Sequence, residues 1–97
     1  MSKRQAPTTC PVAAVAALLS DTWTMLVIRD LLRGPQRFGT LCESLAGIST
    51  RTLTAKLKRL TEAGIVAKKD VKYSLTPQGR KLGHIIRAMS AYGQQYL

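Results

Sequence analysis

The chain has 97 residues, of which 45% are hydrophobic and 21% charged, a balance typical of a folded protein and far from that of a disordered one. Fifteen Lys and Arg residues stand against five Asp and Glu, so the formal net charge is +10. This excess predicts a polyanionic partner, with nucleic acid as the first candidate and an anionic membrane as the second.

The two cysteines, Cys10 and Cys42, are too few for a disulfide framework or a four-thiolate zinc site. This low count favours a reducing cytoplasm. Lys3 and Arg4 ahead of the apolar run at 12–19 imitate a secretion signal, but the run is short and follows a proline. No stretch reaches the roughly 20 apolar residues of a membrane span, so we expect a cytoplasmic protein without a membrane partner.

The chain begins with a polar segment at 1–8, which predicts a flexible basic tail ahead of one domain at 9–97. Thr9 or Cys10 is placed to cap a first helix. Its first turn contains a proline, which is tolerated there because that backbone N–H has no helical partner. We expect this helix to run to about Leu19.

A second helix restarts at Ser20 or Asp21 and ends before the Gly-Pro pair at 34–35. Its apolar residues cover most of the circumference, which places it in the middle of the domain. Apolar residues then recur with a helical period from Phe38 to Leu45 and predict a third helix. Cys42 lies on the inward side of that helix, where packing is the expected role.

Ser49 is placed to cap a fourth helix from Thr50 to about Ala63. Two β-prone segments follow, at 65–69 and 71–75, and predict a tight hairpin. A Thr-Pro pair then opens one continuous helix to about Tyr96, roughly 30 Å long at 1.5 Å per residue. The apolar stripe of so long a helix needs a second chain to cover it.

Two helices joined by a short glycine-containing turn predict a helix-turn-helix, and the hairpin after them makes it winged. On a helical wheel Leu53, Leu57 and Leu60 form the buried stripe of the fourth helix, and its opposite crest is basic. Long cations there reach phosphates or base edges, and threonines add donors. The predicted DNA contacts are Arg37, Ser49, Thr50, Arg51, Thr52, Thr54, Ala55, Lys58, Arg59, Lys68, Lys69 and Lys72.

Other interpretations stay open at this point. Basic residues outside a helix are often only a solvated face, and Arg37 serves equally well as an ion-pair partner. A winged helix also acts as a protein-interaction module or as an architectural protein that binds DNA without sequence preference. An enzyme is not expected, because the chain has one histidine, His84, few acids and no glycine-rich phosphate loop, and nothing predicts a metal or cofactor.

Four blocks together resemble the HxlR-type winged helix transcriptional regulators, distant relatives of the MarR type: Cys10-Pro11, 21–38, 48–66 and 73–82. The resemblance implies a mainly α fold with a small β-hairpin wing and extra N- and C-terminal helices for dimerisation. It also implies a homodimeric repressor whose recognition helices enter successive major grooves of a pseudo-palindromic operator. The predicted dimer contacts are Val12, Val15, Leu19, Ile85, Ile86, Met89, Tyr92 and Tyr96.

The chain departs from that family pattern in two places. Its wing is shorter than usual, with only 69–71 between the block GIVAK at 64–68 and the block KYSL at 72–75, so the resemblance leaves open whether the wing contacts DNA. Tyr92 stands where the family tends to have a tryptophan, which keeps an aromatic anchor.

Cys10 corresponds to the position of a thiol switch in several members of the resembled family, which respond to oxidants or electrophiles. A thiol at a helix start beside Lys3 and Arg4 favours the reactive thiolate. Oxidation or alkylation there would shift a helix of the dimer interface and change the spacing of the recognition helices. The alternative is a small capping residue without a regulatory role.

Overall fold

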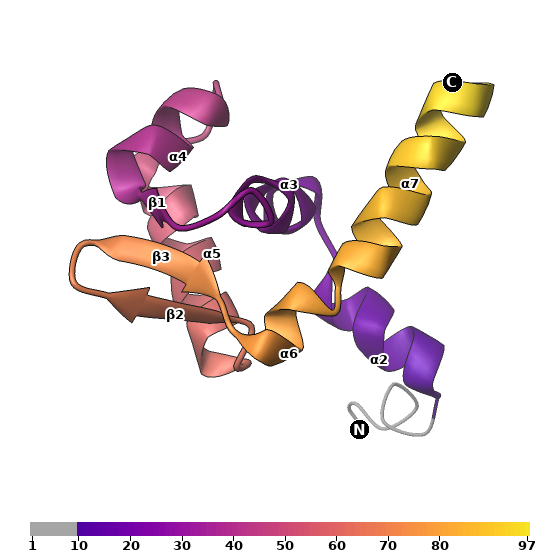
Figure 1. Cartoon of the computed structure of the whole chain (residues 1–97), viewed down its shortest axis with the longest axis horizontal. Coiled ribbons are helices and arrows are strands. Elements are labelled where there is room, and N and C mark those ends of the chain that lie inside the picture. The colour runs from indigo at the N-terminus through magenta and orange to yellow at the C-terminus, as the bar shows by residue number, and fades with distance from the viewer. Residues whose placement is uncertain (1–9) are drawn as a thin grey trace.

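The computed structural model describes residues 10–97, so the predicted basic tail at 1–8, the Thr9 cap, and Lys3 and Arg4 lie outside the described part of the chain. A mainly helical chain carries one small antiparallel sheet (Figure 1). The elements are α2 (Pro11–Leu18), α3 (Thr22–Leu31), β1 (Gln36–Arg37), α4 (Phe38–Ser44), α5 (Thr50–Glu62), β2 (Val66–Lys69), β3 (Lys72–Leu75), α6 (Pro77–Arg80) and α7 (Gly83–Tyr96).

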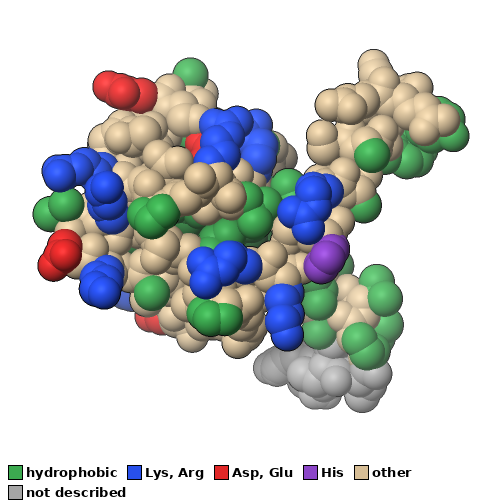
Figure 2. Space-filling view, viewed as in Figure 1, with side chains coloured by type: hydrophobic (Ala, Val, Ile, Leu, Met, Phe, Trp, Pro, Cys, Tyr) green, Lys and Arg blue, Asp and Glu red, His purple; other side chains and the backbone are tan. Residues whose placement is uncertain are grey.

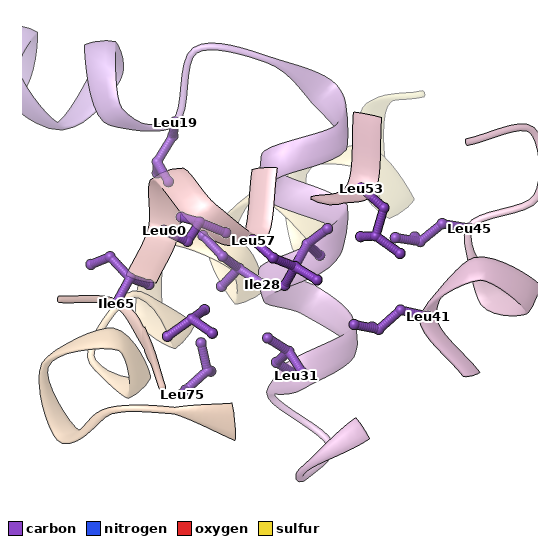
Figure 3. Packing of buried hydrophobic residues seen from close by; sticks show 12 residues of the cluster. Leu19, Ile28, Leu31, Leu41, Leu45, Leu53, Leu57, Leu60, Ile65 and Leu75 are labelled. Carbon is purple, nitrogen blue, oxygen red and sulfur yellow. The ribbon is translucent and has the colours of Figure 1, made fainter. Parts of the chain in front are cut away.

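Helix α3 runs through the middle of the domain, as its all-round apolar surface predicts (Figure 1). Its start is fixed by Asp21, whose carboxylate accepts a hydrogen bond from the Thr24 N–H at 2.8 Å. Val27 and Ile28 are fully buried, and each contributes roughly 1.5–3 kcal/mol by leaving water. Leucines of α4 and α5 close around α3 (Figure 3). The core residues are Leu19, Val27, Ile28, Leu31, Leu41, Leu45, Leu53, Leu57, Leu60, Ile65, Val66 and Leu75.

The sheet has the strand order β1-β3-β2. The predicted hairpin is therefore joined by a third strand, β1, that was not predicted from the sequence. β1 is only Gln36–Arg37 and pairs antiparallel with β3. Two residues are too short to show an alternating pattern, and the pairing exists only because the hairpin lies beside them. The turn at the tip of the hairpin contains Asp70 with a φ of 58°, a conformation that aspartate tolerates better than most residues.

The single long helix predicted from Pro77 to Tyr96 is wrong, because the structure divides it into α6 and α7. α6 is held at the base of the wing: the Thr76 hydroxyl donates to the Gly64 carbonyl at 2.6 Å, and Gly79 packs directly on the Ile65 backbone. Tight i to i+3 hydrogen bonds around Leu82 then turn the chain away from the wing. Contacts to distant residues therefore decide the break.

Helices α2 and α7 project from the side of the domain opposite the wing tip and diverge from each other (Figure 1). Within residues 10–97 no single helix is long and apolar enough to cross a membrane. The pair α2 and α3 reaches the necessary length and composition only together, and the two helices are bent by 85° at their junction.

Candidate nucleic-acid interface

Helices α4 and α5 form the predicted helix-turn-helix, with Gly47 supplying a positive φ of 96° in the turn between them. The predicted Ser49 cap is confirmed: its hydroxyl oxygen accepts the Thr52 N–H at 3.0 Å. Leu53 and Leu57 hold one face of α5 against the core. The opposite face is therefore presented to solvent along four turns.

The exposed crest of α5 carries Arg51, Thr54, Ala55 and Lys58. Neither cation forms an ion pair with any residue in the range 10–97. Ala55 lies between them, and its short side chain allows a large partner to approach the helix closely. Ser49 and Thr50 are exposed at the N-terminal end of the same helix, where backbone N–H groups favour anions.

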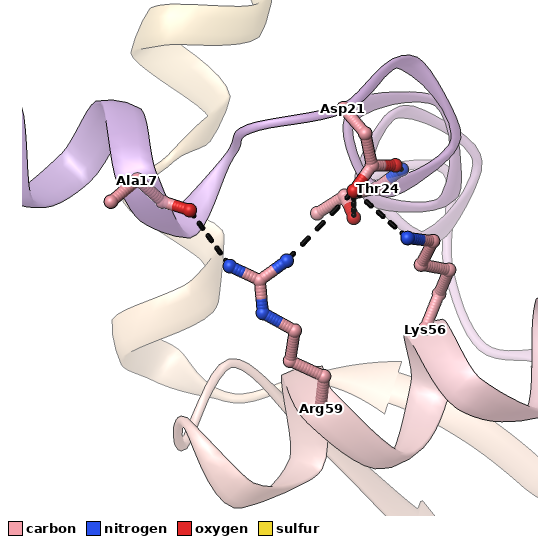
Figure 4. Close-up of polar contacts among 5 residues, drawn as sticks. All are labelled: Ala17, Asp21, Thr24, Lys56 and Arg59. Atoms are coloured by element: carbon pink, nitrogen blue, oxygen red, sulfur yellow. Dashed lines mark hydrogen bonds and ion pairs between the residues drawn. The ribbon is translucent and has the colours of Figure 1, made fainter.

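The other cations of α5 face the protein (Figure 4). Lys56 Nζ lies 3.0 Å from Asp21 Oδ2, at the start of α3. Arg59 Nη2 donates to the Ala17 carbonyl of α2 at 2.7 Å, and its Nη1 lies 3.8 Å from Asp21 Oδ2. The geometry therefore places Arg59, predicted as a DNA contact, in an intramolecular network. Thr52 is also half-buried, and its hydroxyl accepts from the Ser49 hydroxyl at 2.9 Å.

Asp21 is the centre of this network. Burial raises the pKa of its carboxyl, but the hydrogen bonds from the Thr24 N–H, the Lys56 ammonium and the Thr24 hydroxyl, with the Lys56 charge, outweigh burial and lower the pKa below its ordinary value. Lys56 stands 35 positions after Asp21 in the chain. No local pattern reveals a contact over this sequence distance, although a helical wheel places Lys56 beside the buried stripe of α5 and away from its exposed crest.

The wing brings three predicted cations into one row across the sheet. Lys72 of β3 pairs with Arg37 of β1 on one side and with Lys69 of β2 on the other. Residues paired in this way project from the same face with Cβ atoms about 4.5–5.5 Å apart, and like charges so close are destabilising. None of the three forms an ion pair within the described chain. Lys and Arg side chains gather around the wing in Figure 2.

Lys68 projects from the other face of the wing and toward α5. It pairs across the strands with Tyr73, and its Nζ lies 5.4 Å from the centre of the Tyr73 ring. Tyr73 was not predicted as a site residue, and it is half-buried against the core.

The predicted dimer contacts lie on α2 and α7, with one exception. Val12 and Tyr92 are exposed, and Ile85 and Met89 continue the apolar stripe of α7. Tyr96 packs on Tyr92 with ring centres 4.9 Å apart. Val15 and Ile86 are half-buried against the core. The exception is Leu19, which is 7% exposed and belongs to the core of the single chain because it closes α2 onto α3 and α5.

A hollow of about 680 Å³ separates α2 from the start of α7, lined mainly by apolar side chains that include Val12, Val15 and Ile85. Cys10, the exposed N-cap of α2, directly precedes Pro11, which lines this hollow, and the Cys10 side chain makes no capping hydrogen bond. Cys42 is half-buried against the core, in agreement with its predicted packing role.

A helix-turn-helix followed at once by a β-hairpin, with an exposed basic second helix, defines the winged helix class of DNA-binding proteins. The chain belongs to the HxlR-like helix-turn-helix family, whose model matches residues 18–97. It is accordingly a helix-turn-helix transcriptional regulator of the HxlR and MarR-like type, and the resemblance inferred from the sequence is confirmed.

Two sequence relatives show how far the similarity extends. The HTH-type transcriptional regulator sll1512 of Synechocystis is 38% identical over 95 residues, which cover 91% of this chain and 70% of that protein. The regulator YodB of Bacillus subtilis is 32% identical over 97 residues, which cover 92% of this chain and 87% of that protein.

Solved structures agree with this assignment. Quinone-bound YodB from B. subtilis has a TM-score of 0.83 at 34% identity, covering 90% of this chain and 100% of that one. The redox regulator HypR in its oxidised form has a TM-score of 0.85 at 28% identity, covering 91% of this chain and 98% of that one. The predicted mainly α winged fold is thereby confirmed.

Proposed function

We propose that this regulator binds double-stranded DNA sequence-specifically as a homodimer, with α5 of each protomer in a major groove. The proposal rests on one observation: two of the basic side chains of α5 are bound within the described part of the protein, and the other two are not. Lys56 and Arg59 are engaged with Asp21 and the Ala17 carbonyl, while Arg51 and Lys58 are exposed and unpaired within residues 10–97. Arg51 and Lys58 lie on the side of α5 opposite the core, from which long side chains reach base edges in a major groove.

The wing supports the same proposal. Arg37, Lys72 and Lys69 occupy paired positions in one row across the three strands, and such neighbouring like charges favour a bound anion. A DNA phosphate relieves that repulsion and releases counterions. We therefore assign this row to phosphate contacts and the crest of α5, with Ser49, Thr50 and Thr54, to the groove. Arg59 is left out of the proposed contacts, and Thr52 serves the helix cap.

The homodimer is supported by the apolar surfaces of α2 and α7. Val12 is 77% exposed and Tyr92 62% exposed, which is high for apolar groups on one side of a small domain. A second copy would bury both helices and hold two α5 helices at a fixed separation. For a two-fold site that separation is about 34–36 Å, one turn of DNA.

We further propose that the dimer represses transcription and that Cys10 makes it responsive to oxidants or electrophiles. The exposed Cys10 thiol lies at the start of α2, one residue before Pro11 of the apolar hollow, and α2 is joined to α5 through the Arg59 hydrogen bond. A covalent adduct on Cys10 would change the packing of α2 and, through it, the placement of α5. The structures of quinone-bound YodB and oxidised HypR concern related regulators and motivate this proposal.

Binding-site selection from random duplexes, followed by a salt series on the selected duplex, tests the DNA proposal. A dimer that neutralises about eight phosphates should lose on the order of 10⁴ in affinity between 50 and 200 mM salt. Selection of a two-fold symmetric site is the expected result. Equal affinity for all duplexes would indicate an architectural protein, and no binding at low salt would indicate a protein-interaction module.

The Cys10→Ser variant tests the switch. It should bind the selected duplex with wild-type affinity and keep that affinity after treatment with diamide or a quinone, whereas the wild-type protein should lose affinity. A Cys42→Ser variant is the matched control and should respond like the wild type. A Cys10→Ser protein that still responds would refute the switch. A reporter promoter that carries the selected site should be silenced by the untreated protein, and activation instead would contradict repression.

A further inference from the structure

A second, smaller hollow lies between α5 and the wing, with a volume of about 290 Å³. It borders two residues of the crest, Thr54 and Lys58, and so opens onto the proposed DNA surface. On the wing side it is bordered by Lys68 and Tyr73. Its volume is at the lower end of the roughly 300–1,000 Å³ that ligand pockets occupy, which suits a small chemical group.

The lining of this hollow combines carbon surface with cations at its edge. Leu57 is buried beneath it, and the Thr61 hydroxyl donates to the Leu57 carbonyl at 2.8 Å, so Thr61 adds little polarity. Lys58 and Lys68 supply two ammonium groups, one from each side. Such a lining favours a group that has a carbon face and a negative charge.

We propose that the hollow holds one deoxyribose-phosphate unit of the DNA backbone. If α5 occupies a major groove and the wing points toward the neighbouring minor groove, the strand that separates the two grooves passes between α5 and the wing. The sugar would lie on the carbon surface, and its phosphate would meet the Lys68 ammonium. This inference rests on the proposed function and extends it to a contact that reads no base but fixes the register of α5.

Tyr73 is the positioning residue of this contact. Lys68 and Tyr73 pair across β2 and β3, and the ammonium lies 5.4 Å from the ring centre. A cation near an aromatic face is attracted to it, so the lysine loses part of its rotamer freedom before DNA arrives. Binding then costs less entropy than for a free surface lysine.

Glu62 also borders the hollow, and its carboxylate opposes a phosphate. The inference therefore predicts two opposite effects. Removal of the Lys68 charge should weaken the contact with the phosphate, whereas removal of the Glu62 charge should strengthen it. Lys69 offers a matched control, because it lies on the same strand and carries the same charge but projects from the opposite face of the wing.

The experiment measures binding of the selected duplex after single phosphates are replaced, one at a time, by neutral methylphosphonates. With the wild-type protein, replacement at one backbone position per half-site should cost about tenfold in affinity, the value of a hydrogen bond to a charged group. In Lys68→Gln the same replacement should cost little more, because the partner is already gone. In Lys69→Gln it should still cost about tenfold.

Two further variants complete the test. Glu62→Gln should bind the natural duplex more tightly, by about twofold to fivefold at low salt. Tyr73→Leu should show part of the Lys68→Gln effect, because it removes the attraction that positions Lys68 but leaves the lysine charge, while Tyr73→Phe should behave like the wild type. Melting temperatures check that each variant folds. The comparison of Lys68→Gln with Lys69→Gln is sufficient by itself to test the inference. If every phosphate replacement cost Lys68→Gln as much affinity as it costs the wild type, the inference would be overturned and the proposed function would stand. A protein that selects no duplex would overturn both.

Discussion

Lys56 Nζ lies 3.0 Å from Asp21 Oδ2 and joins the middle of α5 to the residue that caps α3. Both side chains are largely shielded from water, with 24% and 30% of their surface exposed. The same carboxylate accepts the Thr24 N–H at 2.8 Å. One carboxyl group thus caps α3 and ties α5 to the start of that helix.

Asp21→Ala should lower the free energy of unfolding by about 1–3 kcal/mol, because it removes the helix cap and leaves Lys56 without its partner. Asp21→Asn keeps a good cap and should cost less, about 1 kcal/mol. Urea denaturation followed by circular dichroism measures both. Asp70→Asn removes an equal charge from the exposed wing turn and should change stability by less than about 0.5 kcal/mol. Equal losses at both positions would contradict a special role for Asp21.

The stability of the wild type should also depend on pH through Asp21. The folded state lowers the pKa of this carboxyl, so its stabilisation is present above the unfolded pKa of about 3.9 and is lost as the pH falls through the folded pKa. Urea titrations between about pH 5 and pH 2 should show a steeper decline for the wild type than for Asp21→Asn. Parallel curves would show that the Asp21 network contributes nothing to acid sensitivity.

Lys58 and Arg59 are adjacent in α5 and carry the same charge, but within residues 10–97 only Arg59 has an intramolecular partner. Lys58→Gln should weaken DNA binding by roughly 1–3 kcal/mol, or reduce the salt slope by about 1 if the contact is a phosphate, with little change in stability. Arg59→Gln should instead lower stability by about 1 kcal/mol, since its side chain is 43% exposed and solvent screens the contact. Fluorescence anisotropy and thermal melts separate the two outcomes. Similar DNA losses in both variants would return Arg59 to the DNA surface.

Gly79 lies so close to the Ile65 backbone that a Cβ would overlap the Ile65 carbonyl oxygen. Gly79→Ala should therefore destabilise the protein by at least about 2 kcal/mol and loosen α6 from the base of the wing. Gly39→Ala is the control, since nothing lies within 4 Å of its Cβ position and alanine favours the α4 helix by roughly 0.5–1 kcal/mol. Chemical denaturation should show opposite signs, and a neutral Gly79→Ala would show that α6 shifts freely.

Met89→Glu should convert the proposed dimer into monomers, because it places a charge in the apolar stripe of α7, where Met89 is 47% exposed in the single chain. Gln94→Glu adds the same charge on the opposite side of that helix and should leave the dimer intact. Sedimentation velocity at several protein concentrations measures the assembly. A Met89→Glu protein that remains dimeric would place the interface elsewhere.

The sequence by itself determined the local elements and the buried stripe of α5. Helix caps and helical periods depend on residues close together in the chain, so Ser49, Leu53 and Leu57 predict α5 without any knowledge of the fold. The wing followed from two short β-prone segments. The family followed from blocks of residues whose combination is specific.

Only the tertiary structure decided which cations remain for a partner. Arg59 flanks the crest on a helical wheel and was predicted with Lys58 as a DNA contact, but it meets a carbonyl of α2 that stands 42 positions earlier in the chain. β1 exists only because β3 lies beside it, and the break before α7 arises because α6 is tied to the Gly64 and Ile65 backbone. Such contacts join residues far apart in the chain, and a helical period or a cap motif carries no information about them because it depends on near neighbours alone.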